Sequence, residues 1–260
     1  MHEQERWQAI VRLVQERSVI SARELAAVTR ASPATIRRDL THLAAQGMVR
    51  RMHGGVRALA SPEGSTLEAR RFGVSQALNA GRKRAVAERA AALCRDGESI
   101  IINGGSTTFH MVEFLRTSRL QILTNSFPIA AALMQDSDNR IILPGGEIYR
   151  DQSLILSPFD QDSIQHYTAS KMFMSAASIG PLGLIESDPL IARAEAKLLT
   201  RAADLIVLAD SSKFEPRGSM AVAPLSRIRR LITDDGIPPA ARDMLAEAGV
   251  EVEIVVVDEG

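Results

Sequence analysis

The stretch that most constrains the fold of this chain is residues 32–55, SPATIRRDLTHLAAQGMVRRMHGG. Ser32 is a favoured N-cap residue, and Pro33 suits the first helical position, where its missing N–H leaves no hydrogen bond unmade. The segment therefore predicts a helix that begins at a defined residue and keeps its polar and basic side chains off the core face. The apolar residues that recur at helical spacing and predict that core face are Ile36, Leu40 and Leu43.

Two further helical segments precede this one. Apolar residues at positions 7, 10, 11 and 14 fall on one face of a helix over residues 5–16. Ser21 precedes Glu24 by three residues, which is the capping-box pattern that opens a short second helix. Two helices joined by a tight turn, the second with polar and basic residues near its start, are typical of a helix-turn-helix.

A basic hairpin follows the third helix. Gly47 ends the helix, residues 48–51 predict a short strand, and Gly54-Gly55 predicts a tight hairpin tip. A helix-turn-helix with such a hairpin is a winged helix-turn-helix, an α+β DNA-binding fold. The residues predicted to contact DNA, on the third helix and on the wing, are Ser32, Thr35, Arg37, Arg38, Arg50, Arg51 and His53.

Charge is distributed unevenly along the chain. Residues 1–60 hold ten arginines against four glutamates and one aspartate, a net charge of about +5, although the whole chain has a formal net charge of zero. This region is suited to a polyanion, and double-stranded operator DNA is the partner we expect. The alternative interpretation is a solvated basic helix in a small helical domain.

The chain divides into three predicted parts. Residues 1–57 form the DNA-binding domain, residues 58–80 a linker and lead-in segment rich in Ser, Gly, Pro and Ala, and residues 81–260 a second domain. The second domain begins with a helix predicted over residues 81–97. Its basic first turn opposes the helix dipole, which predicts either a linker-facing surface or a functional patch at Arg82, Lys83 and Arg84.

The rest of the chain alternates strands and helices. Apolar strand candidates include ESIIING, LQILTN, RIILPGG, MFMSAAS, LIVLAD, RLIT and VEIVVV, and PLIARAEAKLLTRAA is an intervening helix. Repeated units of this kind predict an α/β domain with a mainly parallel sheet. The ligand crevice of such a sheet lies at the carboxyl ends of its strands.

Polar clusters follow several of these strands, at residues 104–108, 124–126, 145–147 and 210–213. Each cluster alone is typical of a turn or a helix cap. Together they supply the hydroxyl, amide and ammonium groups that suit a phosphorylated polyol. The first cluster lacks the lysine of a P-loop and the spacing of a dinucleotide-binding loop, so a small phosphate is favoured over a nucleotide.

Enzymatic chemistry has few candidate groups. Glu195 is the candidate general base, and it does not share a helix face with Lys197, two residues away. The five histidines show no metal-ligand spacing, and no Ser-His-Asp arrangement can be argued. We therefore expect no cofactor and no metal.

The compartment follows from cysteine usage and hydropathy. The single cysteine, Cys94, leaves no disulfide framework within one chain and indicates a reducing environment. The N-terminus lacks the apolar segment of a signal peptide, and no run of about 18 apolar residues is present. These features predict a cytoplasmic protein without a membrane span.

The motifs resemble one known family. SPATIRRDL followed by RRMHGG resembles the helix-turn-helix and wing of the DeoR-type repressors of bacterial sugar catabolism, and INGGSTT, ILTNS, LPGGE, EAKLL and IVLADSSKF are similar to that family's sensor-domain motifs, in the same order. The resemblance implies a sensor fold similar to sugar-phosphate isomerases and an effector that is a phosphorylated sugar or sugar acid. The effector contacts that it implies are Asn103, Gly105, Ser106, Thr107, Thr108, Asn125, Gly145, Gly146, Glu195 and Lys213.

The chain also departs from the family pattern. Family members usually carry Asp at the positions of Asn103 and Ser170, and the loss of both carboxylates weakens any isomerase chemistry, because proton shuttling needs a positioned acid or base. SIGPLGLIESDP replaces a GI-rich stretch, which changes the expected shape of the pocket. The segments QSLILSP, KMFMSA and GLIESDPLIARAEAKLL are most similar to the subgroup that represses ascorbate utilisation, whose signal is a phosphorylated ascorbate.

These features predict a repressor of a carbohydrate-utilisation operon that leaves its operator when the effector binds. A homo-oligomer, either dimer or tetramer, is expected because one small reading domain gives modest affinity. The alternative from another class is a sugar-phosphate isomerase-like enzyme with a DNA-binding appendage. A third interpretation is a phosphosugar-binding module whose basic domain contacts another protein.

Overall fold

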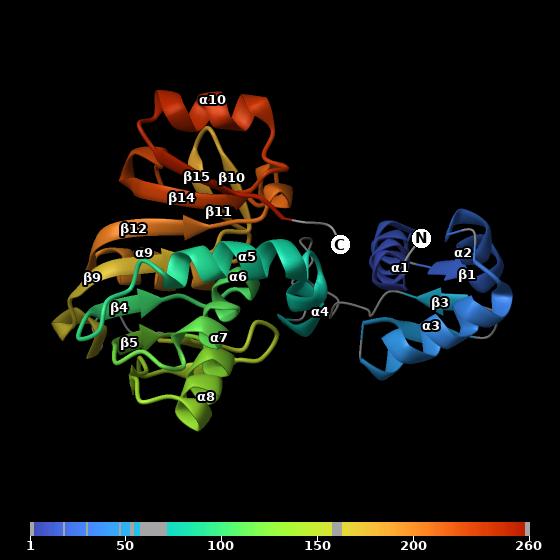
Figure 1. Cartoon of the computed structure of the whole chain (residues 1–260), viewed down its shortest axis with the longest axis horizontal. Helices are drawn as coiled ribbons and strands as arrows, with labels where there is room; N and C mark the ends of the chain where they lie inside the picture. The colour runs from blue at the N-terminus through green and yellow to red at the C-terminus, as the bar shows by residue number, and fades with distance from the viewer. Residues whose placement is uncertain are drawn as a thin grey trace. The chain divides into compact units, whose positions relative to one another are not determined.

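A computed structural model describes residues 3–17, 19–29, 31–46, 48–52, 55–57, 72–157 and 163–257. The chain divides into two compact units, residues 1–69 and residues 70–260 (Figure 1). Each unit has its own hydrophobic core. None of the helices within the described ranges is both long and apolar enough to cross a membrane.

The first unit contains three helices and a small antiparallel sheet. The helices are α1 (Glu3–Arg17), α2 (Ala22–Thr29) and α3 (Pro33–Ala45), and the strands are β1 (Val19–Ser21), β2 (Arg50–Met52) and β3 (Gly55–Arg57) in the order β1-β3-β2. The predicted apolar faces of α1 and α3 are confirmed, since Trp7 is half-buried and the following residues are buried: Ile10, Val11, Val14, Ile36, Leu40 and Leu43.

The predicted helix starts of this unit are confirmed by their caps. The Ser21 hydroxyl accepts a hydrogen bond from the Glu24 N–H at 3.1 Å, and Glu24 Oε2 accepts one from the Ser21 N–H at 3.1 Å, which completes the capping box. Ser32 Oγ accepts from the Thr35 N–H at 3.1 Å, and Pro33 occupies the first turn of α3. The helix therefore starts where its sequence indicates.

The wing differs from expectation in two details. Strand β2 begins at Arg50, two residues later than predicted, and pairs with β3 in the register Arg50 with Arg57. Strand β1 was not predicted; it adds a third strand because Ile20, buried in the core, pairs across from Val56. The predicted stop at Gly47 lies outside the described residues, as does Gly54 of the predicted Gly54-Gly55 tip, whereas Gly55 is the first residue of β3.

The second unit is built on a seven-stranded sheet whose strand pairs are all parallel, in the order β15-β14-β12-β9-β4-β5-β6. This confirms the predicted α/β class. The strands are β4 (Ser99–Ile102), β5 (Gln121–Thr124), β6 (Arg140–Ile142), β9 (Ala169–Met174), β12 (Ala202–Leu208), β14 (Ile228–Asp234) and β15 (Glu251–Val255).

Helices cover both faces of this sheet. Its strands send alternate residues to opposite sides, so Ile100 and Ile102 join one core while Ile101 joins the other. The first core is covered by α5 (Ala80–Ala91), α7 (Met111–Leu115) and α8 (Phe127–Asp136), and the second by α9 (Pro189–Leu199) and α10 (Pro239–Glu247).

The strand order reverses beside β4. The chain runs from β4 outward to β5 and β6, then returns to β9 on the other side of β4 and continues outward to β12, β14 and β15. Neighbouring connections therefore leave in opposite directions at the carboxyl ends of β4 and β9. In open α/β sheets this is the switch point at which ligands bind.

Shorter elements complete the unit, and most of them were not predicted. They are α4 (Phe72–Ala77), α6 (Ser106–Phe109), the hairpin β7 (Glu147–Tyr149) and β8 (Leu154–Leu156), the antiparallel strands β10 (Ser178–Gly180), β11 (Gly183–Glu186) and β13 (Met220–Ala223), and the 3₁₀ turns η1 (Ser163–His166), η2 (Ser211–Phe214) and η3 (Leu225–Arg227). Helix α4 lies within the segment expected to be a linker and lead-in.

The helix predicted over residues 81–97 ends early. Helix α5 stops at Ala91, and turns carry the chain on to Gly97. The apolar pattern misled the prediction because Leu93 and Cys94 still pack against the core after the helix has ended. The chain after β4 forms two short helices, α6 and α7, that are divided at His110.

Candidate DNA-binding and effector sites

The N-terminal half of α3 presents the residues predicted to read DNA. Arg37 and Arg38 are exposed, as is the cap residue Ser32, while Thr35 is half-buried. The hydroxyls of Ser32 and Thr35 lie 2.8 Å apart and share a hydrogen bond. Two guanidinium groups are thus free of the core on the first two turns of a rigid helix, the part that enters the major groove in helix-turn-helix proteins.

The wing is attached to the same helix. Arg51 NH1 donates to Thr41 Oγ1 at 3.0 Å, and that hydroxyl in turn donates to the Arg37 carbonyl at 2.8 Å. The contact fixes the position of the wing relative to the predicted reading face. Of the other predicted wing residues, Arg50 lies in β2 and His53 lies outside the described residues.

A buried carboxylate holds α3 against α1. Asp39 is 3% exposed and accepts hydrogen bonds from Arg6 Nε at 2.6 Å and from Trp7 Nε1 at 2.8 Å. Burial opposes ionisation of Asp39, but the bonds from Arg6 and Trp7 outweigh it and hold the pKa of this carboxyl below its usual value. Sequence analysis did not identify Asp39, since its partners lie 32 and 33 residues away.

The predicted effector residues of the second unit meet at the switch point, and Asn103 links them. Asn103 follows β4, donates from Nδ2 to Glu195 Oε1 at 2.8 Å, and accepts at Oδ1 from the Ser175 N–H at 3.0 Å. One amide therefore connects the carboxyl ends of β4 and β9 to helix α9. A carboxylate at this position would have no N–H group to donate to Glu195.

The Gly104-Gly105 turn lies between two neighbouring loops. The Gly104 N–H donates to Asn125 Oδ1 at 2.8 Å, after β5. On the other side, a Cβ at Gly105 would lie 2.6 Å from both Cβ and Oγ of Ser175, so only glycine fits this turn unless Ser175 moves. Thr108 Oγ1 closes the turn by donating to the Asn103 carbonyl at 2.8 Å.

Several polar atoms around this turn are buried without a hydrogen-bond partner. They are Thr107 Oγ1, Asn125 Nδ2 and Ser175 Oγ. Such atoms are costly unless a ligand or a water molecule satisfies them. Ser175 was not predicted as a site residue; its position after the strand MFM, at the carboxyl end of β9, was the available signal.

Carboxyl groups with unusual ionisation lie behind the turn. Burial and the neighbouring carboxyl of Glu186 raise the pKa of Glu195, which is 3% exposed, well above its ordinary value. Burial likewise raises the pKa of Glu186, although N–H donors and the ammonium of Lys213 oppose the shift. Lys213, on η2, is thus near enough to Glu186 to affect its carboxyl group.

The remaining predicted positions are less closely joined to this group. Gly145 and Gly146 are exposed at the start of the β7–β8 hairpin. Gly146 has a φ of 150°, and a Cβ at this position would clash with the Leu156 carbonyl. The hairpin itself reaches the site, because the Ile155 N–H donates to the Asn125 carbonyl at 2.7 Å. Ser106 is half-buried at the start of α6.

Ser170 lies at the wrong end of the sheet to affect the site. It is near the amino end of β9, and its hydroxyl donates to the carbonyl of Ser99, the first residue of β4, at 3.2 Å. Parallel strands carry their amino ends to the edge opposite the crevice. Of the two positions at which family members usually carry Asp, only Asn103 therefore belongs to the candidate site.

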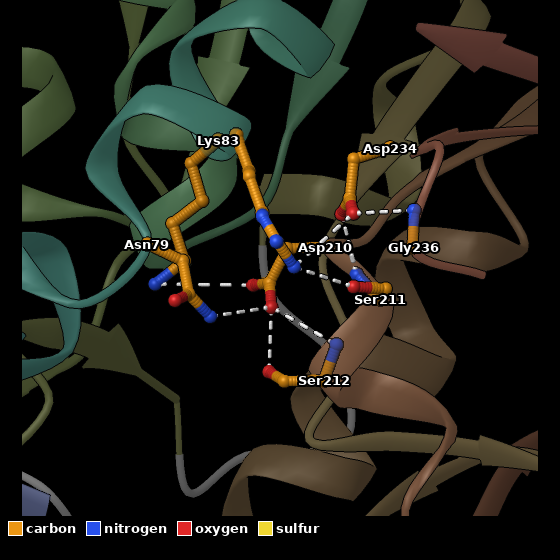
Figure 2. A network of polar contacts seen from close by, with 8 residues as sticks. Asn79, Lys83, Asp210, Ser211, Ser212, Asp234 and Gly236 are labelled. Atoms are coloured by element: carbon orange, nitrogen blue, oxygen red, sulfur yellow. Dashed lines mark hydrogen bonds and ion pairs between the residues drawn. The ribbon is translucent and has the colours of Figure 1, made fainter. Parts of the chain in front are cut away.

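A second polar cluster, at the carboxyl ends of β12 and β14, was only partly anticipated (Figure 2). It joins Asp210 to Asn79 and Lys83, and Asp234 to Arg82, where α5 begins. Arg82, Lys83 and Arg84 were predicted to form either a linker-facing surface or a functional patch. Lys83 is instead 3% exposed and belongs to this cluster, whereas Arg84 is exposed and pairs with Glu113. No group of three or more His, Cys, Asp or Glu among the described residues is arranged to hold a metal.

Comparison with known proteins identifies the class. The model of the DeoR-like helix-turn-helix domain matches residues 6–61, and that of the DeoR C-terminal sensor domain matches residues 78–235. The chain belongs to the DeoR family of helix-turn-helix transcriptional regulators.

Relatives of known identity agree with this class. The chain is 30% identical over 254 residues to the HTH-type transcriptional regulator UlaR of Shigella dysenteriae serotype 1, covering 97% of this chain and 99% of that protein. UlaR of Escherichia coli O1:K1 matches with the same identity and coverage.

Solved structures give weaker likenesses. Ribose 5-phosphate isomerase A of Methanocaldococcus jannaschii matches with a TM-score of 0.38 and 20% identity, covering 51% of this chain and 53% of that one. eIF2B delta of Chaetomium thermophilum matches with a TM-score of 0.39 and 17% identity, covering 53% and 49%. The chain spans about half the length of these proteins, and likenesses at this level say nothing about activity.

Proposed function

We propose that this regulator represses a carbohydrate-utilisation operon in the cytoplasm and that a phosphorylated sugar or sugar acid releases it from its operator. Residues 1–57 bind DNA, residues 81–260 bind the effector, and residues 58–80 connect the two functions. The protein acts as a homo-oligomer, dimer or tetramer, on repeated half-sites.

The observation that carries the DNA-binding role is the exposure of Arg37 and Arg38 on a helix whose start is fixed by Ser32 and whose position is fixed by Asp39. Paired arginines suit guanine edges in the major groove, where a guanidinium donates two hydrogen bonds to O6 and N7. Ser32 and the wing residues Arg50, Arg51 and His53 are assigned to the phosphate backbone or the minor groove.

The DNA-binding role is tested with an operator selected from random duplexes, followed by fluorescence anisotropy. Arg38→Ala is expected to lose about 1–3 kcal/mol of binding free energy, roughly 5–150-fold in Kd. Arg116→Ala, which removes an exposed arginine of the second unit, is the matched control. Unchanged affinity in the Arg38 variant would count against α3 as the reading helix.

The same assay separates DNA from a protein partner as the target of the basic region. Binding that rests on phosphate contacts weakens steeply and linearly on a plot of log affinity against log salt concentration. Salt-insensitive association with a protein, together with no binding to any duplex at low salt, would favour the interaction-module interpretation.

The effector role is supported by the unpartnered donors around Gly104-Gly105, namely Thr107 Oγ1, Asn125 Nδ2 and Ser175 Oγ, with the Lys213 ammonium on the neighbouring loop. Hydroxyl and amide donors suit the oxygens of a polyol, and an ammonium suits a phosphate or carboxylate. A phosphorylated ascorbate is the first compound to test, since the resemblance to the ascorbate subgroup and the UlaR relatives favour it.

A thermal-shift screen of sugar phosphates and phosphorylated sugar acids tests this role. A ligand at 100 times its Kd adds about 2.7 kcal/mol to the stability of the state that binds it. Binding should be reduced in Lys213→Ala and retained in Arg116→Ala. If no compound of this class raises the melting temperature, the proposed effector class is wrong.

We infer that the sensor unit performs no catalysis. The side-chain amide of Asn103, at the switch point, is hydrogen-bonded through both Nδ2 and Oδ1, and its Nδ2 donates to Glu195. Incubation with pentose and hexose phosphates is expected to give no turnover. Turnover that disappears in Glu195→Ala would instead favour the isomerase-like alternative.

A further inference from the structure

The joint between α4 and α5 has an unusual construction. Asn79 occupies the N-cap position of α5 with a left-handed φ of 54°, and its side chain does not cap the helix. Asn79 Nδ2 donates instead to Asp210 Oδ1 at 3.0 Å, 131 residues further along the chain. The angle between the two helices is therefore tied to the carboxyl end of β12.

Lys83 makes a second connection across the same joint (Figure 2). Its ammonium donates to the Ser75 carbonyl of α4 at 2.5 Å and lies 4.0 Å from Asp210 Oδ2. Lys83 is 3% exposed, and a charge buried to this degree is stable only while such partners surround it. Burial opposes ionisation of Asp210, yet Lys83, Ser212, Lys213 and Asn79 together hold the pKa of Asp210 below its usual value.

Asp210 opens the loop that carries a predicted effector contact. Its Oδ1 accepts from the Ser212 hydroxyl at 2.5 Å, and Lys213 is the next residue of the same turn. The loop is fixed at a second point, because the Ser211 N–H donates to Asp234 Oδ2 at 2.6 Å. Arg82 bridges both, with NH1 3.0 Å from Ser211 Oγ and 3.4 Å from Asp234 Oδ1.

Helix α4 also contacts the other predicted effector segment. It packs against α6, which begins at Ser106, and the His110 ring that follows α6 hydrogen-bonds to the backbone of Gln76. Within the part of the chain that the structure describes, α4 is the first element after residues 58–71, the segment that leads from the first unit. The segment of residues 104–108 thus contacts α4 directly through α6, and the loop of residues 210–213 is connected to α4 through Asn79 and Lys83.

We propose that Lys83 is a positioning residue that couples effector binding at the loop of residues 210–213 to the orientation of α4. An anion bound by Lys213 attracts the Lys213 ammonium and weakens its interaction with the Asp210 carboxylate. Lys83 and Asn79 must then stabilise that carboxylate to a greater extent. Asp210 and the Ser75 carbonyl compete for the Lys83 ammonium, so the strength of the hydrogen bond from Lys83 to Ser75 changes. The inference rests on the proposed function only in its effector step.

The first experiment needs no effector. Backbone hydrogen exchange in the full chain should accelerate at least threefold over residues 72–79 in Asp210→Asn, which keeps the shape and the Oδ1 acceptor but removes the charge. Arg84→Met, which breaks the neighbouring exposed ion pair with Glu113, should leave those amides unchanged. Unchanged exchange of α4 in Asp210→Asn would overturn the proposed link.

The second experiment separates coupling from a merely structural role. The readout is the ratio of operator Kd values with and without ascorbate 6-phosphate, or with whichever screened sugar phosphate stabilises the native chain. Lys83→Met should bring this ratio close to one while the thermal shift with the same compound persists. Lys83→Arg, which keeps a charged donor, should restore most of the ratio.

Other outcomes are equally decisive. A Lys83→Met variant with the native ratio would overturn the proposal, as would a ratio lost equally in Arg84→Met. If Lys83→Met does not fold, Asp210→Asn and Lys83→Arg carry the ratio measurement, and a native ratio in Asp210→Asn overturns it. If no compound shifts the native melting temperature, the proposed effector class fails, and the exchange experiment still decides the link between Asp210 and α4.

Discussion

Asp39 holds α3, the proposed reading helix, against α1. It belongs to α3 and accepts hydrogen bonds from both Arg6 and Trp7, which belong to α1. Trp7 is the single tryptophan of the chain, and its ring stacks on His42 at a centroid distance of 4.1 Å. Tryptophan fluorescence consequently reports on the first unit alone.

We expect Asp39→Ala to destabilise the first unit by about 2 kcal/mol or more, because it removes the buried acceptor of the hydrogen bonds from Arg6 Nε and Trp7 Nε1. Urea unfolding followed by Trp7 fluorescence measures the loss. The matched control is Asp235→Ala, which removes an exposed carboxylate from the second unit. A native urea midpoint in the Asp39 variant would show that these bonds contribute little.

Glu195 gives the sensor unit a pH dependence of known sign. Its pKa is raised in the folded state by burial and by Glu186, so the folded chain holds a proton that the unfolded chain releases above about pH 4.5. The stability that this proton contributes is complete below that pH and is lost as the pH rises toward the folded pKa.

Glu195→Gln should therefore match the native chain in stability near pH 4.5 and exceed it increasingly toward pH 8. The glutamine carbonyl still accepts from Asn103 Nδ2, so the hydrogen bond survives. Circular dichroism during urea unfolding at a series of pH values measures the difference, with Glu247→Gln on the exposed face of α10 as control. A difference that does not vary with pH would contradict the raised pKa.

At the scale of elements, the parts predicted well are those determined by neighbouring residues. The capping box at Ser21 and the cap at Ser32 both fix helix starts within three residues of chain, and both were readable. The apolar strands of the parallel sheet were equally legible, since strands buried on both faces are continuous apolar runs.

Elements that depend on distant partners were missed. Strand β11 forms between β10 and β13, and its Leu184 pairs with Ala223, a residue that no local pattern connects to it. The same limit applied to the candidate sites. The strand-end positions of Asn103 and Asn125 were predictable, whereas Ser175, Glu186 and the Lys83–Asp210 contact depend on which strands become neighbours.

The cap of α3 offers a prediction at this scale. Ser32→Ala should destabilise the first unit by about 1 kcal/mol, because the Thr35 N–H loses its acceptor, while Ser32→Gly should cost only a few tenths. Urea unfolding by Trp7 fluorescence distinguishes the two. Equal losses in both variants would mean that the hydroxyl does not act as the cap.

At the scale of the whole molecule, the distribution of charge suits a division of tasks. The net charge of about +5 lies within residues 1–60, and the remaining residues balance it. An acidic sensor region does not attract DNA, so electrostatics favour DNA binding by the basic first unit. Under the proposed function, the candidate effector loops would therefore act on DNA binding through the connecting segment or through the arrangement of subunits.

An oligomer makes a geometric prediction about the operator. Two reading helices related by a twofold axis require half-sites on the same face of DNA, about 10 base pairs apart or a multiple of that. Light scattering should give a mass that is a multiple of the 28.2 kDa chain. Inserting about five base pairs between half-sites should reduce affinity toward that of one half-site, and inserting about ten should restore part of it, because only the second insertion returns both sites to one face. Fluorescence anisotropy with the full chain measures the series, and equal affinity at every spacing would mean that each unit binds its site independently.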